Sequence, residues 1–224
     1  MLELNKIYNM DCMEGMKQMP DKSVDLLLCD PPYGVNIKYN EYKDTEENWY
    51  SLMDKFIPEA RRIAKMVVFP SCQIKRLKWF YDNYPPDWII CWHKGSPGHV
   101  SYVGFNDWEP HMVYGKTQGI CMHDYFSIPN TEKMGNYGHP CPKPIRWAKW
   151  FISGATKKGG VVCDTFAGSG TTAIAAYDLE RNYMAFEIDK DYYDAAVKRI
   201  EQHKAQISFD TITEESPEQV MLEV

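Results

Sequence analysis

The chain has 224 residues, of which 44% are hydrophobic and 25% are charged, and its formal net charge is −6 at neutral pH. This is the composition of a globular protein, and it contains no apolar run of the ~18 residues that a membrane-spanning helix requires. The negative charge disfavours a uniformly basic surface for nucleic acid, although a local basic face remains compatible with it.

The expected elements follow from the spacing of apolar residues, which recur every second position or in short runs in strands and every three to four positions in helices. In chain order, the expected strands are 7–11, 24–29, 66–71, 88–94, 109–116, 160–166 and 182–189. The expected helices are 13–19, 49–64, 75–84, 144–155, 171–180 and 192–206. A polar, mobile loop is expected at 36–48, and patterning is weak at 117–137.

Strands and helices alternate at both ends of the chain, which predicts an α/β fold with a mostly parallel sheet. No linker-like stretch divides the sequence, so residues 1–206 are expected to form a single domain. Residues 207–224 are expected to form an extension with little core of its own.

The seven cysteines are scattered, odd in number and without a C-x-x-C pair. We therefore expect free thiols in a cytoplasmic protein rather than disulfides or a zinc site. The histidines also lack ligand spacing, so no metal is expected. The N-terminal residues lack the basic start and apolar core of a signal peptide.

The strand predicted at 24–29 ends abruptly in the sequence Asp30-Pro31-Pro32-Tyr33. Neither proline has an N–H, so the hydrogen-bond ladder of a sheet cannot continue through them. The chain therefore presents a carboxylate and an aromatic ring at the carboxyl end of a buried strand. Taken alone, Asp30 could equally cap a turn, and Tyr33 could equally be a core aromatic.

A second signal is the strand, glycine turn and helix at 163–177. The glycines and alanine of G-S-G-T-T-A (168–173) fit the relaxed dinucleotide fingerprint, and Glu187 follows about 20 residues later, where a ribose-binding acid is expected. No lysine precedes the two threonines, which excludes a P-loop. The glycine turn could serve only the packing of helix against strand. Otherwise the pattern indicates a ribose-containing ligand. That ligand is either a dinucleotide, as in an NAD-dependent oxidoreductase, or S-adenosylmethionine.

Four segments together resemble one family: CDPPYG (29–34), GHPCPKP (138–144), DTFAGSGTT (164–172) and FEID (186–189). They resemble the amino-group DNA methyltransferases of the permuted beta class, in which the catalytic motif precedes the cofactor loop. The resemblance covers residues 5–203. It implies a Rossmann-like, S-adenosylmethionine-dependent methyltransferase fold with circularly permuted motif order and an antiparallel edge hairpin on a mostly parallel central sheet.

The resemblance also implies a role for each matching residue. The catalytic motif is matched by Asp30, Pro31, Pro32 and Tyr33. Asp11 resembles the acid that reads the cofactor's adenine, and Glu187 resembles the ribose ligand. The full set expected to bind the cofactor is Asp11, His139, Lys143, Asp164, Phe166, Ala167, Gly168, Gly170, Thr171 and Glu187.

Two positions depart from the family pattern. The chain has Asp164-Thr165-Phe166 where the family usually has D-P-F, a change expected to be harmless at the end of a strand. It also has Cys141-Pro142 in the segment that is usually H-P-T-Q-K-P. The second departure removes two polar side chains, which weakens the assignment of contacts around His139 and Lys143.

The expected chemistry is methyl transfer to an exocyclic amine of a base, whose lone pair is delocalised into the ring. Asp30 and the carbonyl of Pro31 would accept the two amine N–H groups and localise that lone pair, while Tyr33 stacks on the base. Such an amine is reached only in single-stranded DNA or after base flipping. In this family an aspartate at the first position accompanies chiefly adenine. Adenine in DNA is therefore predicted, with a cytosine amine or RNA as alternatives.

The region at 117–137, where the family has its target-recognition segment, is too short for a recognition domain. A short or relaxed recognition sequence is therefore expected, in a solitary, phage-borne or restriction–modification enzyme. Dimerisation is common in the class and is neither favoured nor excluded here. The residues that could contact phosphates, or equally be solvated surface charges, are Lys75, Arg76, Lys78, Lys94 and His99.

Overall fold

The computed structural model describes residues 2–71, 74–95, 100–101, 104–117, 122–129 and 140–214. Eight strands form one sheet in the order β1-β10-β9-β2-β3-β7-β4-β8. Their bounds are β1 Lys6–Asn9, β2 Val24–Leu28, β3 Ala64–Pro70, β4 Trp88–His93, β7 Trp108–Gly115, β8 Tyr125–Ser127, β9 Val161–Asp164 and β10 Asn182–Glu187. A separate hairpin pairs β5 (Val100–Ser101) with β6 (Gly104–Phe105).

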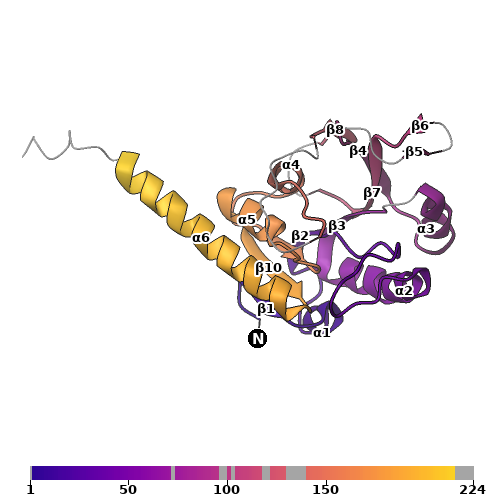
Figure 1. Ribbon diagram of the computed structural model, residues 1–224, viewed down its shortest axis with the longest axis horizontal. Helices are drawn as coiled ribbons and strands as arrows, with labels where there is room; N and C mark the ends of the chain where they lie inside the picture. Colours follow the sequence, from indigo (N-terminus) through magenta and orange to yellow (C-terminus); the bar gives the residue numbers. More distant parts are fainter. Residues whose placement is uncertain are drawn as a thin grey trace, which may run out of the picture.

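Helices cover both faces of the sheet (Figure 1). They are α1 Cys12–Lys17, α2 Glu46–Ile63, α3 Leu77–Asn83, α4 Ile145–Ala155, α5 Thr171–Asp178 and α6 Lys190–Glu214, with a 3₁₀ turn at Ile74–Arg76. Within the part of the chain that the structure describes, no helix is both long and apolar enough to cross a membrane. The predicted α/β architecture is confirmed.

Strand β2 shows why the sheet is buried on both faces. Leu26 and Leu28 belong to the apolar cluster that packs under α4 and α5, whereas Val24, Leu27 and Cys29 belong to the cluster under α1 and α2. All five side chains are fully buried. A run of apolar residues without alternation is what a strand between two helical layers requires.

The two halves of the sheet meet at β2 and β9, which are parallel neighbours. The chain leaves β9 toward β10 and leaves β2 toward β3, on opposite sides of this junction. In open α/β sheets, such a point of reversal opens a crevice at the carboxyl ends of the strands. Both predicted motifs directly follow these two strands, so the fold brings them together.

The antiparallel strands β7 and β4 are not at the very edge of the sheet, where the edge hairpin was predicted, because β8 pairs outside β4. Strand β7 is antiparallel to both β3 and β4 and lies between them. Strand β8, within the weakly patterned region, then pairs in parallel with the outer side of β4. The pairing of β7 with β3 aligns His111 with Pro70 and therefore places the start of β7 beside the carboxyl end of β3.

The polar loop predicted at 36–48 is held by hydrogen bonds, contrary to the mobile loop that we expected. The carboxylate of Asp44, which is 2% exposed, accepts the backbone N–H groups of Gly34, Val35 and Ile37. Thr45 then caps α2, which begins three residues earlier than predicted. At the other end of the chain, α6 continues through residue 214 rather than ending near residue 206.

Candidate active site

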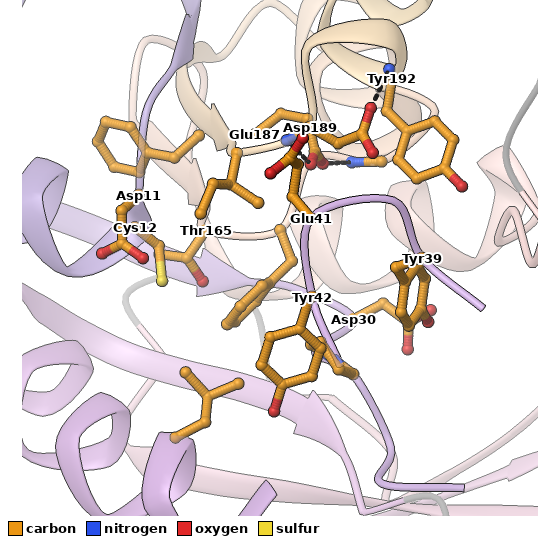
Figure 2. A pocket seen from close by; sticks show the side chains of 16 residues that line it. Asp11, Cys12, Asp30, Tyr39, Glu41, Tyr42, Thr165, Glu187, Asp189 and Tyr192 are labelled. Carbon is orange, nitrogen blue, oxygen red and sulfur yellow. Dashed lines mark hydrogen bonds between the residues drawn. The ribbon is translucent and has the colours of Figure 1, made fainter. Parts of the chain in front are cut away.

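A pocket of about 800 Å³, partly open to solvent, lies at the carboxyl ends of β2, β9 and β10 (Figure 2). The loop between β2 and α2 forms one of its walls with Tyr39, Glu41 and Tyr42. The remaining lining residues are Asp11, Cys12, Asp30, Pro32, Leu52, Thr165, Phe166, Gly168, Phe186, Glu187, Ile188, Asp189 and Tyr192. Most of the predicted cofactor residues therefore line this cavity or the one next to it.

A second, smaller pocket of about 330 Å³ adjoins the first. It is lined by Lys143, Asp164, Ala167 and Thr171 among others, and it shares Asp30, Phe166 and Gly168 with the first pocket. The side chain of Asp30 thus borders both spaces. The predicted cofactor set is divided between the two pockets, apart from His139, which lies outside the described residues, and Gly170, which shapes the turn.

The glycine turn after β9 requires its glycines for conformation. Gly168 and Gly170 have φ angles of +48° and +76°, in the region that favours glycine. Glu187, at the end of β10, stabilises this turn by accepting the N–H of Gly168 at 2.7 Å on Oε2. Its Oε1 accepts the N–H of Asp189 at 2.9 Å. The predicted ribose acid therefore also organises the backbone of both cofactor segments.

Asp11 ends the loop after β1 and caps α1, because its Oδ1 accepts the N–H groups of Met13 and Glu14. Its side chain lines the first pocket, on the wall opposite the loop that carries Tyr39 (Figure 2). Its role in reading the adenine of the cofactor stays a prediction.

The first pocket combines apolar surfaces with a buried acceptor, which suits an adenosine group. Phe166 and Ile188 provide apolar surfaces, and Ile188 is 47% exposed although it is a large aliphatic residue. Asp189 also lines the pocket, and its buried Oδ2 has no hydrogen-bond partner among the described residues. A buried acceptor left without a donor is costly. A ligand with hydroxyl or amino donors would satisfy it, and S-adenosylmethionine fits this chemistry.

The catalytic motif forms a compact polar cluster with two residues from distant parts of the chain. Tyr33 Oη lies 2.5 Å from Asp30 Oδ1 and 3.0 Å from Glu109 Oε1. Lys143 Nζ donates to Tyr33 Oη at 2.6 Å and lies 3.1 Å from Asp30 Oδ1. The β2–β3–β7 pairing brings Glu109 to this cluster, and the segment before α4 brings Lys143.

Burial and neighbouring charges shift the carboxylates of this cluster in opposite directions. Loss of water raises the pKa of Asp30, and the Glu109 charge adds to this while Lys143 opposes it. Burial, the largest single influence, raises the pKa of Glu109, but Lys143, His111, Lys94 and the hydrogen bond from Tyr33 together hold that pKa below its ordinary value. Two carboxylates next to one cation therefore differ in how readily they take a proton.

Asp164, at the end of β9, is a third carboxyl group at this edge of the sheet. Burial raises its pKa to about 7, although hydrogen bonds from Thr172 and the Phe166 N–H favour the charged form. Its side chain faces the smaller pocket. Strongly shifted groups inside a cleft are typical of functional sites.

Arg76 lies in a different place from the one predicted for a phosphate contact. It is 1% exposed, and its guanidinium stacks 3.9 Å from the centre of the Trp49 ring. It donates to the carbonyl oxygens of Tyr33 and Gly34. The prediction that Arg76 binds DNA is therefore wrong. The buried guanidinium instead anchors the backbone of Tyr33 and Gly34, at the end of the catalytic motif.

The other predicted DNA contacts are exposed, half-buried or outside the described residues. Lys75 and Lys78 are exposed and lie near Glu46 and Asp82 respectively. The backbone N–H of Lys94 donates to Asp107 at 2.8 Å, which fixes the end of β4. His99 is outside the described residues.

The sequence reasoning missed two groups of site residues. Glu109 is the second residue of the buried strand β7, in the motif Glu-Pro-His, and an acid in such an apolar run was the available signal. Tyr39 and Tyr42 lie in a loop whose sequence has no periodic pattern, so nothing in the sequence assigned them to the pocket. Asp44 in the same loop was missed too, because a carboxylate that binds backbone N–H groups has no fixed spacing in sequence.

The strand order, the reversal at β2 and β9 and the two adjoining pockets define the chain as an α/β protein of the methyltransferase fold class. The chain belongs to the N6_N4_Mtase family, described as DNA methylase, which matches residues 77–198, more than half of its length. The matched segment contains Glu109, Lys143 and the glycine turn. Asp30 and Tyr33 lie before it.

Two curated relatives extend the similarity over most of the chain. Type II methyltransferase M.HinfI of Haemophilus influenzae is 27% identical, over 90% of this chain and 69% of that protein. Type II methyltransferase M2.MboI of Moraxella bovis is 25% identical, over 86% of this chain and 86% of that protein.

Solved structures share the fold. The cytosine-N4-specific PvuII DNA methyltransferase gives a TM-score of 0.67 at 18% identity, covering 90% of this chain and 92% of its own. The complex of M1.HpyAVI with SAM gives a TM-score of 0.67 at 21% identity, covering 87% of this chain and 98% of its own.

Proposed function

We propose that this protein transfers a methyl group from S-adenosylmethionine to the exocyclic amine of adenine in DNA. The observation that carries the proposal is the position of Asp30, which borders both pockets at the carboxyl end of β2. A carboxylate there can contact an amine next to the reactive end of a cofactor held by the glycine turn. Membership of the DNA methylase family supports the same reaction.

When bound, S-adenosylmethionine supplies an electrophilic methyl group on a positively charged sulfur. The protein's part is to prepare the nucleophile. Asp30 and the Pro31 carbonyl accept the two N–H groups of the amine, which pulls its nitrogen toward tetrahedral geometry. Pro32 fixes the direction of that carbonyl because its ring restricts the backbone. Asp30, whose pKa is raised by burial, is also suited to take the proton that the amine releases.

Adenine is proposed over cytosine because the first position of the motif is an aspartate, Asp30. The fold similarity to a cytosine-N4-specific enzyme keeps the cytosine amine as the second candidate. Both bases must leave the duplex stack, or start single-stranded, to reach a carboxylate at the base of a pocket. Identifying the methylated base separates adenine from cytosine.

The test is incubation of the protein with isotopically labelled S-adenosylmethionine and unmethylated DNA, followed by digestion to nucleosides. We expect label in N6-methyl-2′-deoxyadenosine, and label in N4-methyl-2′-deoxycytidine instead would replace adenine by cytosine as the substrate base. The matched variant is Asp30→Ala, which should lose transfer but keep cofactor affinity within about twofold, because the glycine turn is held by Glu187 rather than by this side chain. Equal transfer by wild type and Asp30→Ala would refute the proposed role.

The specificity of the reaction is tested on the same products. Since the region at 117–137 is too short for a separate recognition domain, we propose a short or relaxed target sequence. Sequencing methylated genomic DNA reveals every modified position. A long asymmetric site would contradict this part of the proposal.

A further inference from the structure

The hydroxyl of Tyr33 has two carboxylate acceptors. Its oxygen lies 2.5 Å from Asp30 Oδ1 and 3.0 Å from Glu109 Oε1, and it accepts a hydrogen bond from Lys143. A phenol carries only one proton, so it donates fully to one carboxylate at a time. Asp30 and Glu109 therefore compete for the same donor.

The same two carboxylates also compete for one cation. Lys143 Nζ lies 3.1 Å from Asp30 Oδ1 and 3.7 Å from Glu109 Oε1. The side chains of Lys143 and Glu109 are 13% and 10% exposed, so water screens little of this interaction. A charge placed on Glu109 thus changes how strongly Lys143 and Tyr33 bind to Asp30.

The backbone of Glu109 is fixed by a hydrogen-bond chain that runs through His111 of the same strand to α4. The indole N–H of Trp147 donates to Nε2 of the buried His111 at 2.9 Å. Since indole is only a donor, Nε2 must be unprotonated, and the proton is on Nδ1. That nitrogen lies 3.2 Å from the carbonyl oxygen of Glu109 and donates to it. The backbone of Glu109 is therefore fixed with respect to α4, on which Trp147 lies.

A substrate amine must donate to Asp30, and it does so best when Asp30 is not saturated by other donors. We propose that Glu109 is a positioning residue for methyl transfer. It draws the Tyr33 hydroxyl and the charge of Lys143 partly away from Asp30, and it thereby leaves Asp30 better able to accept the amine N–H. This inference rests on the proposed function and adds a second carboxylate to its site.

The proposal has a signature in the pH dependence of kcat. Burial, and then the Glu109 charge, raise the pKa of Asp30, while Lys143 lowers it. Replacing Glu109 by glutamine removes a negative charge, so the pKa of Asp30 falls and activity persists to lower pH. The ionisable groups that face Asp30 or Glu109 are Cys29, Tyr33, Tyr39, Lys94, His111, Cys141, Lys143 and Asp164.

The experiment compares wild type with Glu109→Gln, which keeps the shape of the side chain. We expect kcat to fall about tenfold because the charge of Lys143 is then no longer shared with Glu109 and acts more strongly on Asp30. The acid limb of the kcat profile should move down by about half a pH unit. Cofactor Kd should stay within about twofold. The matched control is Glu201→Gln, the same change at an exposed position of α6, and it should leave all three quantities unchanged.

A double-mutant cycle tests whether Glu109 acts through Tyr33. In a Tyr33→Phe background the hydroxyl is absent, so Glu109→Gln should have a smaller effect on kcat than in wild type. Multiplicative effects of the two substitutions would overturn the proposal. Glu109→Asp retains the charge but withdraws its oxygen from Tyr33, so it should lower kcat and leave the acid limb in place.

The outcomes separate this inference from the proposed function. An active wild type whose Glu109→Gln variant has an unchanged acid limb refutes the inference alone, even if kcat falls, because a structural defect would lower kcat without moving the limb. If Glu109→Gln does not fold, a Glu109→Asp variant with wild-type kcat refutes it equally. A wild type that transfers no methyl group refutes the proposed function.

Discussion

Glu187 Oε2 accepts the backbone N–H of Gly168 at 2.7 Å, so the acid that ends β10 fastens the glycine turn that follows β9. The two residues are 19 positions apart in sequence, Glu187 at the end of β10 and Gly168 in the turn that follows its parallel neighbour β9. The carboxylate that we propose as the ribose ligand is therefore also the one that fixes the shape of the turn.

We predict that Glu187→Gln weakens binding of S-adenosylmethionine about tenfold, or about 1.4 kcal/mol, because an amide offers one acceptor oxygen instead of two. Isothermal titration calorimetry measures the change. Glu180→Gln is the control, since that residue is exposed and pairs only with Lys158 among the contacts described. Unchanged affinity in Glu187→Gln would remove this residue from the cofactor site.

Asp164 predicts a pH dependence of stability in the cofactor-free protein. Burial raises its pKa from an ordinary 3.8 to about 7. The folded state therefore holds a proton that the unfolded state has already lost, and stability falls as pH rises from about 4 to about 7. Thermal melts across this window should show the decline. Asp164→Asn should reduce the slope, and an equal slope in both proteins would contradict the assignment.

We predict that Arg76→Met destabilises the fold by about 1–3 kcal/mol, because the Tyr33 and Gly34 carbonyls lose a buried donor. Urea unfolding measures this change. Lys78→Met is the control for stability, because Lys78 is exposed and pairs only with Asp82 among the contacts described.

The same pair of variants tests the corrected role of Arg76 in solution. If Arg76 binds no phosphate, the dependence of DNA affinity on salt is the same in the folded Arg76→Met protein as in wild type. A salt slope reduced by about one in Arg76→Met would restore the phosphate contact.

Asp44→Ala should release the loop between β2 and α2. The variant removes the acceptor of three backbone N–H groups, those of Gly34, Val35 and Ile37. We expect faster hydrogen exchange at these three amides and a loss of stability of about 3 kcal/mol, since each hydrogen bond contributes about 1. Asp82→Ala, at an exposed position of α3, is the control. Unaltered exchange in Asp44→Ala would show that other contacts hold the loop.

Local patterns in the sequence predicted the parts of the site that depend on single strands and turns. Asp30 directly follows one buried strand and Glu187 ends another, so the strand pattern alone predicts both at one edge of the sheet. Glu109 could not be found this way, because its position depends on the long-range register of β7 against β3. Arg76 was misplaced for a related reason. A basic residue near the start of a helix has the same local pattern whether it faces solvent or an aromatic ring.

The way in which Asp44 holds the β2–α2 loop bears on which residues of that loop can be substituted. Among the residues that the structure describes, its carboxylate binds only backbone N–H groups, which every residue except proline possesses. The side chains between these anchors, including Tyr39, Glu41 and Tyr42, line the pocket without making those bonds. The side chains of residues 38–43 can therefore be substituted without loss of the hydrogen bonds that fix the loop backbone. The tip of the loop is a suitable position for grafting or randomising residues to alter what enters the pocket while the frame of the loop is retained.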